Sequence, residues 1–355
     1  MAVSAVKVSE EKKVAYYKAL DSLKLVPFWE VSQKLVAFEP TTPCRPHLWR
    51  FADIKQSIDL MASYIDVKGA ERRSLVLENP GLPGTAQVTK SLYASLQYVE
   101  PGEVEDSHRH VASAFRFILE GSGSHTTVAG EKFYLAAGDV VLTPNMTWHE
   151  HGNETEKPMI MFDALDIPLV NHFGASFKGL IDGPHEVTRP VGDGLARYGA
   201  GVVAVNDRPA TAAIVSPMMH YPYARIRAAL DAMRSAAAID PCHALKVQYT
   251  NPLTGGHAFP TIGLFLQLVP KGFDPVPYRA TDESIYVVFE GTGTTVIGDQ
   301  KIKWGPKDVF VVPSWHYHQH FADSDAILFS CSDKPAQEKL GLWREQRGNE
   351  PLLFN

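Results

Sequence analysis

A long segment of this chain occurs twice. Residues 117 to 144, FILEGSGSHTTVAGEKFYLAAGDVVLTP, recur as residues 287 to 313, VVFEGTGTTVIGDQKIKWGPKDVFVVP. In this alignment Glu120 corresponds to Glu290 and Pro144 to Pro313, with a single gap in a loop. Both segments read as short strands separated by glycine turns, which is typical of β-hairpins. Repetition of such hairpins predicts two copies of one β-domain.

The composition is that of a globular protein. The chain has 355 residues, of which 45% are hydrophobic, so it is long enough for two packed cores. The net charge is −6 without a long run of like charges, so we expect neither a nucleic acid nor a membrane surface as a partner. Cys44, Cys242 and Cys331 are odd in number and have no CxxC spacing, which favours reduced thiols in a cytoplasmic protein. The N-terminus lacks an apolar signal segment, and the chain has no apolar stretch long enough to span a membrane.

Helical patterns flank the two β-domains. Residues 9 to 25 and 223 to 238 have the apolar spacing of helices, and QEKLGLWREQ near the C-terminus predicts a short helix. The predicted organisation is an N-terminal helical arm (1–75), a first β-domain with a metal site (76–170), a linker with a helix (171–255), a second β-domain (256–335) and a C-terminal tail helix (336–355).

Histidines in the first copy have a spacing that fits metal binding. They lie in two motifs, PGEVEDSHRH and GDVVLTPNMTWHEHGN. Side chains alternate between the faces of a strand, so His108 and His110 can point inward together, and His149 can reach the same metal from a neighbouring strand. The spacing resembles the two motifs of the cupin superfamily. This resemblance implies an all-β bicupin: two double-stranded β-helix (jelly-roll) barrels with flanking helices.

The first motif departs from the cupin pattern at one ligand. A Glu usually follows the second histidine after a spacer of about three or four residues, and Ala114 and Phe115 occupy those positions here. Three neutral imidazoles leave several coordination positions open, which suits Fe(II) that holds both a substrate and O2. The alternative, that these are unrelated surface or core histidines, fits poorly with three histidines at motif spacing.

The second copy has lost most of this site. The first two ligands correspond to Tyr278 and Ala280, and only the third keeps a histidine, His318. We therefore expect one Fe(II) per subunit, in the first copy. His316, His318 and His320 are interpreted as a histidine cluster at a strand end, with a second iron site as the less favoured alternative.

Strand alternation adds further inward-facing side chains. Counting by two from His108 reaches Arg116, so if one strand runs unbroken over these residues, an arginine points toward the metal. Its partner is either a structural carboxylate or the carboxylate of a substrate, and a position beside an open metal favours the substrate. His151 shares the parity of His149 and is either a proton acceptor or a plain hydrogen-bonding partner.

Two neighbouring strands offer more candidates. One strand places Tyr93, Ser95 and Gln97 on one face, and the other places Met159, Met161 and Asp163 on another. These side chains either line a pocket or pack in the core of the barrel. For an aromatic residue such as Tyr93, packing in the core is the commoner role. Arg72 and Arg73 precede the loop ENPGLPG and read as a solvated pair.

Several segments together resemble the gentisate 1,2-dioxygenase family, which has salicylate and 1-hydroxy-2-naphthoate dioxygenases as relatives. They are RRSLVLENPGLPG, SLQYVEPGE, HRHVASAFRFILEGSG, GDVVLTPNMTWHEHGN, FDALDIPL and NPLTGG. The resemblance implies a cytoplasmic homotetramer with one Fe(II) per subunit. Position by position, His108, His110 and His149 match the iron ligands. Arg72, Arg116 and His151 match residues that hold the substrate carboxylate and hydroxyl, and Tyr93, Gln97 and Asp163 fall at pocket positions.

The expected reaction follows from this resemblance. It is the cleavage of gentisate (2,5-dihydroxybenzoate) by O2 to give maleylpyruvate, in the catabolism of aromatic compounds. Tyr93 stands where the salicylate-cleaving members carry Trp, which favours gentisate. Two alternatives remain open: a dioxygenase for salicylate, a substituted salicylate or 1-hydroxy-2-naphthoate, and a non-catalytic cupin that binds an aromatic acid. The complete ligand set and the inward Arg116 argue against the non-catalytic alternative.

Overall fold

A computed structural model of the chain describes residues 9–65, 72–181, 183–201, 214–236 and 238–350. The chain forms two compact units, Met1–Thr41 and Thr42–Asn355. The first unit holds helices α1 (Glu10–Ser22) and α2 (Phe28–Leu35). The hydroxyl of Ser9 caps α1 by accepting a hydrogen bond from the backbone N–H of Lys12 (3.4 Å), which confirms the helix expected near residues 9 to 25.

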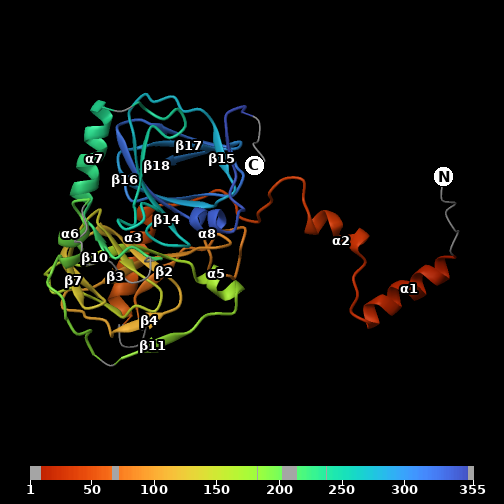
Figure 1. The fold of residues 1–355 in the computed structure, drawn as a ribbon, viewed down its shortest axis with the longest axis horizontal. Coiled ribbons are helices and arrows are strands. Elements are labelled where there is room, and N and C mark those ends of the chain that lie inside the picture. Colours follow the sequence, from red (N-terminus) through yellow and green to blue (C-terminus); the bar gives the residue numbers. More distant parts are fainter. Residues whose placement is uncertain (1–8, 66–71, 182, 202–213, 237, 351–355) are drawn as a thin grey trace. The chain divides into compact units, whose positions relative to one another are not determined.

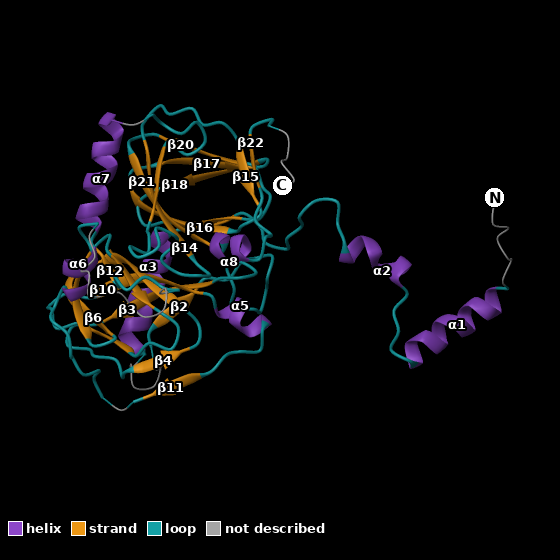
Figure 2. Ribbon diagram, in the orientation of Figure 1, coloured by secondary structure: helices purple, strands orange, loops and turns teal. Residues whose placement is uncertain are grey.

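The second unit consists mainly of β-strands in four antiparallel sheets (Figures 1 and 2). The first copy of the repeat has a six-stranded sheet of β12 (His220–Tyr221), β8 (Val140–Thr143), β5 (Ala114–Glu120), β10 (Met159–Leu165), β3 (Tyr93–Val99) and β2 (Ser74–Val76). Its five-stranded sheet has the order β11 (Lys178–Leu180), β4 (His108–His110), β9 (His149–Gly152), β6 (Ser122–Val128) and β7 (Glu131–Ala136).

The second copy repeats this arrangement. Its six-stranded sheet has the order β1 (His47–Trp49), β19 (Val309–Val312), β16 (Ser284–Glu290), β21 (Ala326–Ser332), β14 (Gly263–Val269) and β13 (Leu245–Gln248). Its five-stranded sheet has the order β18 (Gln300–Trp304), β17 (Gly293–Ile297), β20 (His318–Ala322), β15 (Tyr278–Ala280) and β22 (Glu345–Arg347). The strand order confirms the predicted bicupin, although the described strands of each copy form two separate sheets rather than one closed barrel.

The repeat extends beyond the residues that align by sequence. Asp166 and Asp333 each precede a short helix, α5 (Ile167–His172) and α8 (Lys334–Lys339). The carboxylate of Asp166 accepts a hydrogen bond from the backbone N–H of Ser113 (2.8 Å), and that of Asp333 accepts one from Glu283 (3.0 Å). A buried carboxylate therefore ties the end of each domain to the start of its central strand.

The two copies pack against each other through one face of each six-stranded sheet. Phe117 on β5 and Phe329 on β21 are fully buried and stack with ring centroids 4.2 Å apart. Phe115 also meets Phe329, at 5.5 Å. Between these two phenylalanines, Arg116 points to the opposite face of β5, into the first copy. The apolar interface between the copies thus decides which face of β5 carries the arginine.

Segments outside the repeat complete these layers. Helix α3 (Phe51–Tyr64) places Ile58 and Met61 in the core between the copies, and helix α7 (Tyr223–Ala236) packs against β13. The helix expected over residues 223 to 238 is therefore present. The predicted arm and linker also contribute strands: β1 and β2 come from the arm, and β11, β12 and β13 come from the linker, which also contains α6 (Asp193–Tyr198).

The C-terminal tail differs from its prediction. Helix α8 ends at Lys339, and residues 345 to 347 form β22, which pairs with β15. Gly341 takes a left-handed conformation (φ 71°), and the backbone N–H of Leu342 returns to the carbonyl of Gln337 (2.8 Å). A glycine in this conformation ends a helix, so the prediction that QEKLGLWREQ is one helix was wrong for its second half.

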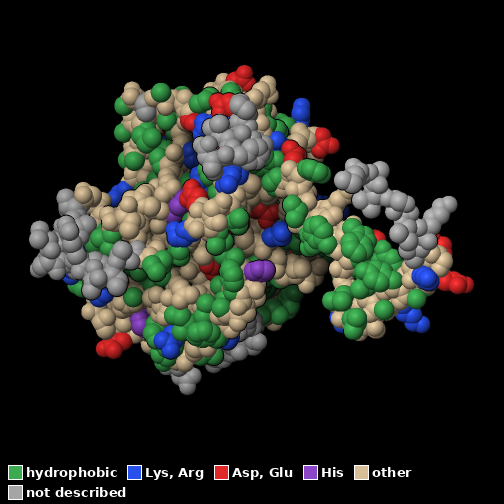
Figure 3. All heavy atoms as spheres, turned by 45° about the vertical axis from the view of Figure 1, so that its right-hand side comes forward, with side chains coloured by type: hydrophobic (Ala, Val, Ile, Leu, Met, Phe, Trp, Pro, Cys, Tyr) green, Lys and Arg blue, Asp and Glu red, His purple; other side chains and the backbone are tan. Residues whose placement is uncertain are grey.

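The surface carries charges of both signs. On the face shown in Figure 3, Lys and Arg side chains are interspersed with Asp and Glu side chains. Among the described residues, no helix is both long enough and apolar enough to cross a membrane.

Candidate active site

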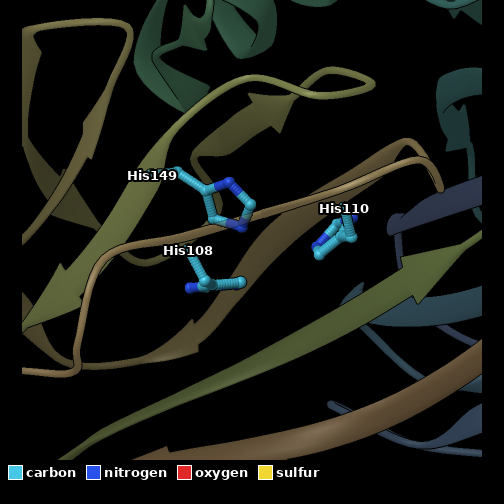
Figure 4. Close-up of side chains that lie close together, drawn as sticks. All are labelled: His108, His110 and His149. Carbon is cyan, nitrogen blue, oxygen red and sulfur yellow. The ribbon is translucent and has the colours of Figure 1, made fainter. Parts of the chain in front are cut away.

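Three histidines converge inside the first copy. His108 on β4 pairs directly with His149 on β9, and their ring centroids are 4.1 Å apart. His110 lies two residues further along β4, with its ring 5.0 Å from that of His149. One ring nitrogen of each residue lies within 4.8 Å of the other two, and the rings gather around one point in Figure 4. The strand pairing therefore produces the cluster that alternation predicted.

The hydrogen bonds of His110 and His149 leave one nitrogen of each ring for a metal, whereas Arg72 contacts both ring nitrogens of His108. Each Nδ1 lies near a backbone carbonyl oxygen: Asp106 for His108 (3.2 Å), Ala112 for His110 (2.6 Å) and Thr147 for His149 (2.8 Å). An Nδ1–H that donates to a carbonyl fixes the tautomer and leaves Nε2 with a free lone pair. The Nε2 atoms of His110 and His149 are buried and have no hydrogen-bond partner among the described residues.

The electrostatics of the cluster also fit a cation. Burial, followed by the nearby guanidinium groups, lowers the pKa of His110 to about 4. The pKa values of His108 and His149 also lie well below the usual range, again mainly because of burial. The rings are therefore neutral near pH 7, the form that binds metals. The side chain of Arg72 contacts Nε2 of His108, so this guanidinium must withdraw before that nitrogen binds a metal.

The second copy keeps the scaffold of this cluster but only one of its three ligands, His318. Tyr278 on β15 pairs with His318 on β20, just as His108 pairs with His149. Within the described part of the chain, only the first copy brings together three side chains able to hold a metal ion. This agrees with the predicted loss of the second site.

Arg116 faces the histidine cluster and is 1% exposed. Its Nη1 donates to the hydroxyl of Thr143 (2.8 Å), and its Nε lies 3.6 Å from a carboxylate oxygen of Asp163. The Nε has no hydrogen-bond partner among the described residues, so part of the guanidinium remains available to a ligand. Burial raises the pKa of Asp163 to about 6, although Arg116 opposes this rise. Arg116 can therefore have both of its predicted partners at the same time, a structural carboxylate on one side and a ligand on the other.

A cavity of about 280 Å³ opens beside these groups. It is lined by most of the predicted site residues: Arg72, Tyr93, Gln97, His108, His110, Arg116 and Asp163. Asp163 on β10 pairs with Ser95 on β3. The alternating residues of β10 that include Asp163 and those of β3 that include Ser95 were expected on different faces, but they lie on the same face of the sheet. That assignment was wrong because the register between the strands cannot be read from either strand alone.

His151 lies deeper than the cavity wall. Its Nδ1 is 2.7 Å from the hydroxyl of Thr126, and its ring centroid is 5.8 Å from that of His149. Its Nε2 is buried without a hydrogen-bond partner among the described residues. Burial holds the pKa of His151 well below its usual range, so the ring is neutral near pH 7.

The structure adds one residue that the sequence did not indicate, Glu105. It is 6% exposed; one carboxylate oxygen lies 3.3 Å from Nε of Arg72, and the other accepts a hydrogen bond from the side chain of Gln97. Burial raises the pKa of Glu105 to about 7, against the effect of Arg72 and Arg116. Glu105 lies outside the regular strands, in the loop before β4, so no alternation pattern marks it.

The alternative interpretation of Arg72 and Arg73 as a solvated pair was wrong, and Arg72 lies where the family resemblance implies, in the cavity wall. Arg73 is 4% exposed and forms ion pairs with Glu100 (2.9 Å) and with Glu103. The two arginines diverge because they lie on opposite sides of the chain just before β2.

Comparisons with known proteins agree with this geometry. Residues 95–167 match the cupin domain family. Gentisate 1,2 dioxygenase 1 of Aquipseudomonas alcaligenes is 49% identical over 341 residues, which cover 96% of this chain and 97% of the relative. 5-Aminosalicylate 1,2-dioxygenase of Comamonas sp is 38% identical over 340 residues, covering 94% of this chain and 89% of the relative.

A solved structure shows the same fold. The salicylate 1,2-dioxygenase of Pseudaminobacter salicylatoxidans is 29% identical and superimposes with a TM-score of 0.90, covering 97% of this chain and 100% of that chain. A structure of the same enzyme as an adduct with gentisate is 28% identical with a TM-score of 0.90, covering 98% of both chains. By fold, site geometry and sequence, this chain belongs to the gentisate 1,2-dioxygenase family and is a ring-cleaving dioxygenase.

Proposed function

We propose that this dioxygenase cleaves gentisate with Fe(II) as its metal. The observation that carries the proposal is the cluster of His108, His110 and His149 beside a cavity into which Arg116 points. Bound Fe(II) would supply open coordination positions for the carboxylate and phenolate of the substrate and for O2. Three neutral ligands leave the charge of the metal uncompensated, which favours a dianionic chelating substrate.

Arg116 and Arg72 hold the carboxylate of gentisate in this proposal. Arg116 is fixed by Thr143 and Asp163, yet keeps Nε free of a hydrogen bond, so its planar group meets the substrate in a defined orientation. Arg72 is held from behind by Glu105. Both arginines lie in the cavity wall next to the histidines, so they orient the ring and offset its negative charge.

His151 is the proposed proton acceptor. The phenolic hydroxyl of gentisate must lose its proton to chelate a metal. The neutral ring of His151, with its unpartnered Nε2 and its Nδ1 fixed by Thr126, supplies the receiving atom. The overall reaction breaks the bond between the carboxyl-bearing and hydroxyl-bearing carbons. Both atoms of O2 enter the product, maleylpyruvate, as expected of an enzyme of aromatic catabolism.

Tyr93, Gln97 and Asp163 form the part of the cavity that selects the substrate. All three line the cavity, and Gln97 and Asp163 are 1% and 4% exposed. Buried polar groups next to a ring favour a substrate that carries an additional hydroxyl, because an unpaired buried polar group costs free energy. Gentisate has such a hydroxyl and salicylate lacks it. The gentisate adduct of the related salicylate dioxygenase shows that this fold accommodates that ring.

We also propose that the enzyme is a cytoplasmic homotetramer with one Fe(II) per subunit, as the family resemblance implies. Light scattering coupled to gel filtration measures the subunit number, and metal analysis measures iron per chain. A monomer in solution would contradict the proposed assembly without affecting the proposed reaction.

The decisive experiment is an assay of O2 uptake. The purified protein is loaded with Fe(II) under nitrogen and then mixed with gentisate, salicylate, 5-aminosalicylate or 1-hydroxy-2-naphthoate in aerated buffer. We expect the highest kcat/KM with gentisate, together with the absorbance of a ring-opened product and one O2 consumed per substrate. A higher kcat/KM for one of the other acids would replace gentisate as the substrate. An absence of O2 uptake with the whole panel would reject the proposed reaction.

A further inference from the structure

The second copy, which lacks two of the three metal ligands, contains a cavity larger than the one beside the histidine cluster of the first copy. Its volume is about 450 Å³, against about 280 Å³ for the cavity beside the histidine cluster. It lies at the position equivalent to the active site, since Tyr278 and His318 line it. A cavity of this volume is in the range of small-molecule sites. At this position the second copy therefore has a space that side chains do not fill.

Lys246 lines this cavity and has no ion-pair partner among the described residues. The Nζ of Lys246 lies 4.9 Å from the ring centroid of Phe265 and 5.7 Å from that of Tyr286. Asp240 and Asp282, the lining acids whose charges act on Lys246, are engaged elsewhere: Asp240 pairs with Arg347 (2.8 Å), and Asp282 accepts a hydrogen bond from the indole of Trp343 (2.9 Å).

Among the described residues, no carboxylate forms an ion pair with Lys246. Burial lowers the pKa of this lysine to about 8, so it is still mainly charged at neutral pH. A buried ammonium group of this kind is stabilised by an anion that enters the cavity.

A histidine in the same wall has an unused acceptor. His318 is 8% exposed, and its Nδ1 lies 3.3 Å from the backbone carbonyl oxygen of His316. Its Nε2 is buried without a hydrogen-bond partner among the described residues. If Nδ1–H donates to the carbonyl, Nε2 is an acceptor that requires an N–H or O–H group from a ligand.

Aromatic side chains form the remaining walls. Tyr278, Tyr286, Phe265 and Trp343 line the cavity, and Tyr278 meets the ring of His318 edge to face, at 5.5 Å. Such walls favour a flat, apolar ring between them. The combination of aromatic walls, one ammonium group and one imidazole acceptor specifies a ligand with a ring, an anionic group and a hydroxyl.

We infer that the cavity of the second copy is a second ligand site, which binds a small hydroxylated aromatic carboxylate without a metal. The carboxylate meets Lys246, the hydroxyl donates to Nε2 of His318, and the ring lies between Tyr286 and Phe265. This site does not depend on the reaction proposed for the first copy, because no residue of the first cavity lines it.

The test uses 4-hydroxybenzoate, whose carboxylate and hydroxyl are too far apart to chelate one metal. Its binding to the full-length iron-loaded enzyme is measured by calorimetry under nitrogen. We expect saturable binding that weakens about tenfold or more in Lys246→Met, because the charge-assisted contact is lost while the length of the side chain is kept. The matched control is Lys303→Met, on the exposed face of β18, which should bind like the wild type. Arg116→Lys should also retain this binding, since Arg116 belongs to the first cavity.

Two outcomes would overturn the inference: no saturable binding by the wild type, or equal affinity in the wild type and in Lys246→Met. If Lys246→Met does not fold, the inference is tested by locating the ligand in the wild type. A crystal of the wild type is soaked with 3-bromo-4-hydroxybenzoate, and the anomalous signal of bromine is mapped. Bromine between Lys246 and His318 supports the second site, and bromine only at the histidine cluster of the first copy rejects it.

Discussion

The substitution Glu105→Gln tests whether Glu105 positions Arg72 for the substrate. Glu105 forms an ion pair with Nε of Arg72 (3.3 Å) and accepts a hydrogen bond from the amide of Gln97. Glutamine has the same size, but its amide N–H2 must face one of these two groups. Loss of one charge-assisted hydrogen bond in a closed site costs about 1.5–3 kcal/mol, so we expect kcat/KM for gentisate to fall about tenfold to a hundredfold. Iron content should stay unchanged, because Glu105 touches none of the three ligands directly.

The pH dependence sharpens this prediction. The pKa of Glu105 is raised to about 7, so the carboxylate is charged above this pH and protonated below it. A protonated glutamic acid cannot form the ion pair with Arg72, and glutamine resembles it. The difference between wild type and variant should therefore be large near pH 8 and shrink as the pH falls through 7 toward 6.

A neighbouring glutamate provides the control. Glu103 is also buried, but it pairs with Arg73 and accepts from the backbone N–H of Glu100 (2.8 Å), away from the cavity. Glu103→Gln should lower the melting temperature without changing kcat/KM for the folded enzyme. Unchanged kinetics of Glu105→Gln at pH 8, or equal losses of kcat/KM in both variants, would refute the positioning role of Glu105.

Four further predictions concern the metal, the substrate and the fold. His108→Ala should lose iron and O2 uptake together, whereas His318→Ala should keep iron near the wild-type content; full iron in the first variant would reject the assigned ligands. Arg116→Lys keeps the charge but loses the planar fork, so KM for gentisate should rise while iron remains bound, and unchanged kinetics would leave this arginine a structural role. Tyr93→Trp should lower the ratio of kcat/KM for gentisate over salicylate, and an unchanged ratio would remove Tyr93 from substrate selection. Burial raises the pKa of Asp333 from 3.8 to about 7. Between these pH values the folded protein keeps a proton that the unfolded chain has released. The free energy of unfolding of the wild type therefore falls as the pH rises through this range, and the loss is complete above pH 7. Relative to wild type, Asp333→Asn should therefore gain on the order of 1–3 kcal/mol in free energy of unfolding between about pH 4 and 8, measured in urea; a constant difference would contradict the raised pKa.

The geometry of the histidine cluster could be predicted because a local pattern was enough. Alternation within β4 placed His108 and His110 on one face, and the repeat located the same strands in the second copy. These are properties of a single strand or of two aligned segments, so the neighbours in space did not have to be known. The loss of the second metal site followed from the same alignment. Arg116 faces the cluster from β5 in the other sheet, so the expectation of one unbroken strand from residue 108 to 116 was wrong.

Other features of the site depended on how separate segments meet. Glu105 belongs to a loop, and only the folded chain brings it between Arg72 and Gln97. The pairing of Asp163 with Ser95 needed the register of two strands that are far apart in the sequence. Arg73 became a buried ion-pair partner because a loop carrying Glu103 folds over it.

The sequence by itself therefore determined the two β-domains and the histidine cluster, because each follows from the periodicity of a strand or from repetition along the chain. Only the tertiary structure decided that Phe117 and Phe329 join the two copies, that Glu105 is buried beside Arg72, and that the cavity behind His318 stays open. The physical reason is that burial, ion pairing and cavity volume arise from contacts between distant segments, and the register of those contacts is fixed by packing of the whole core.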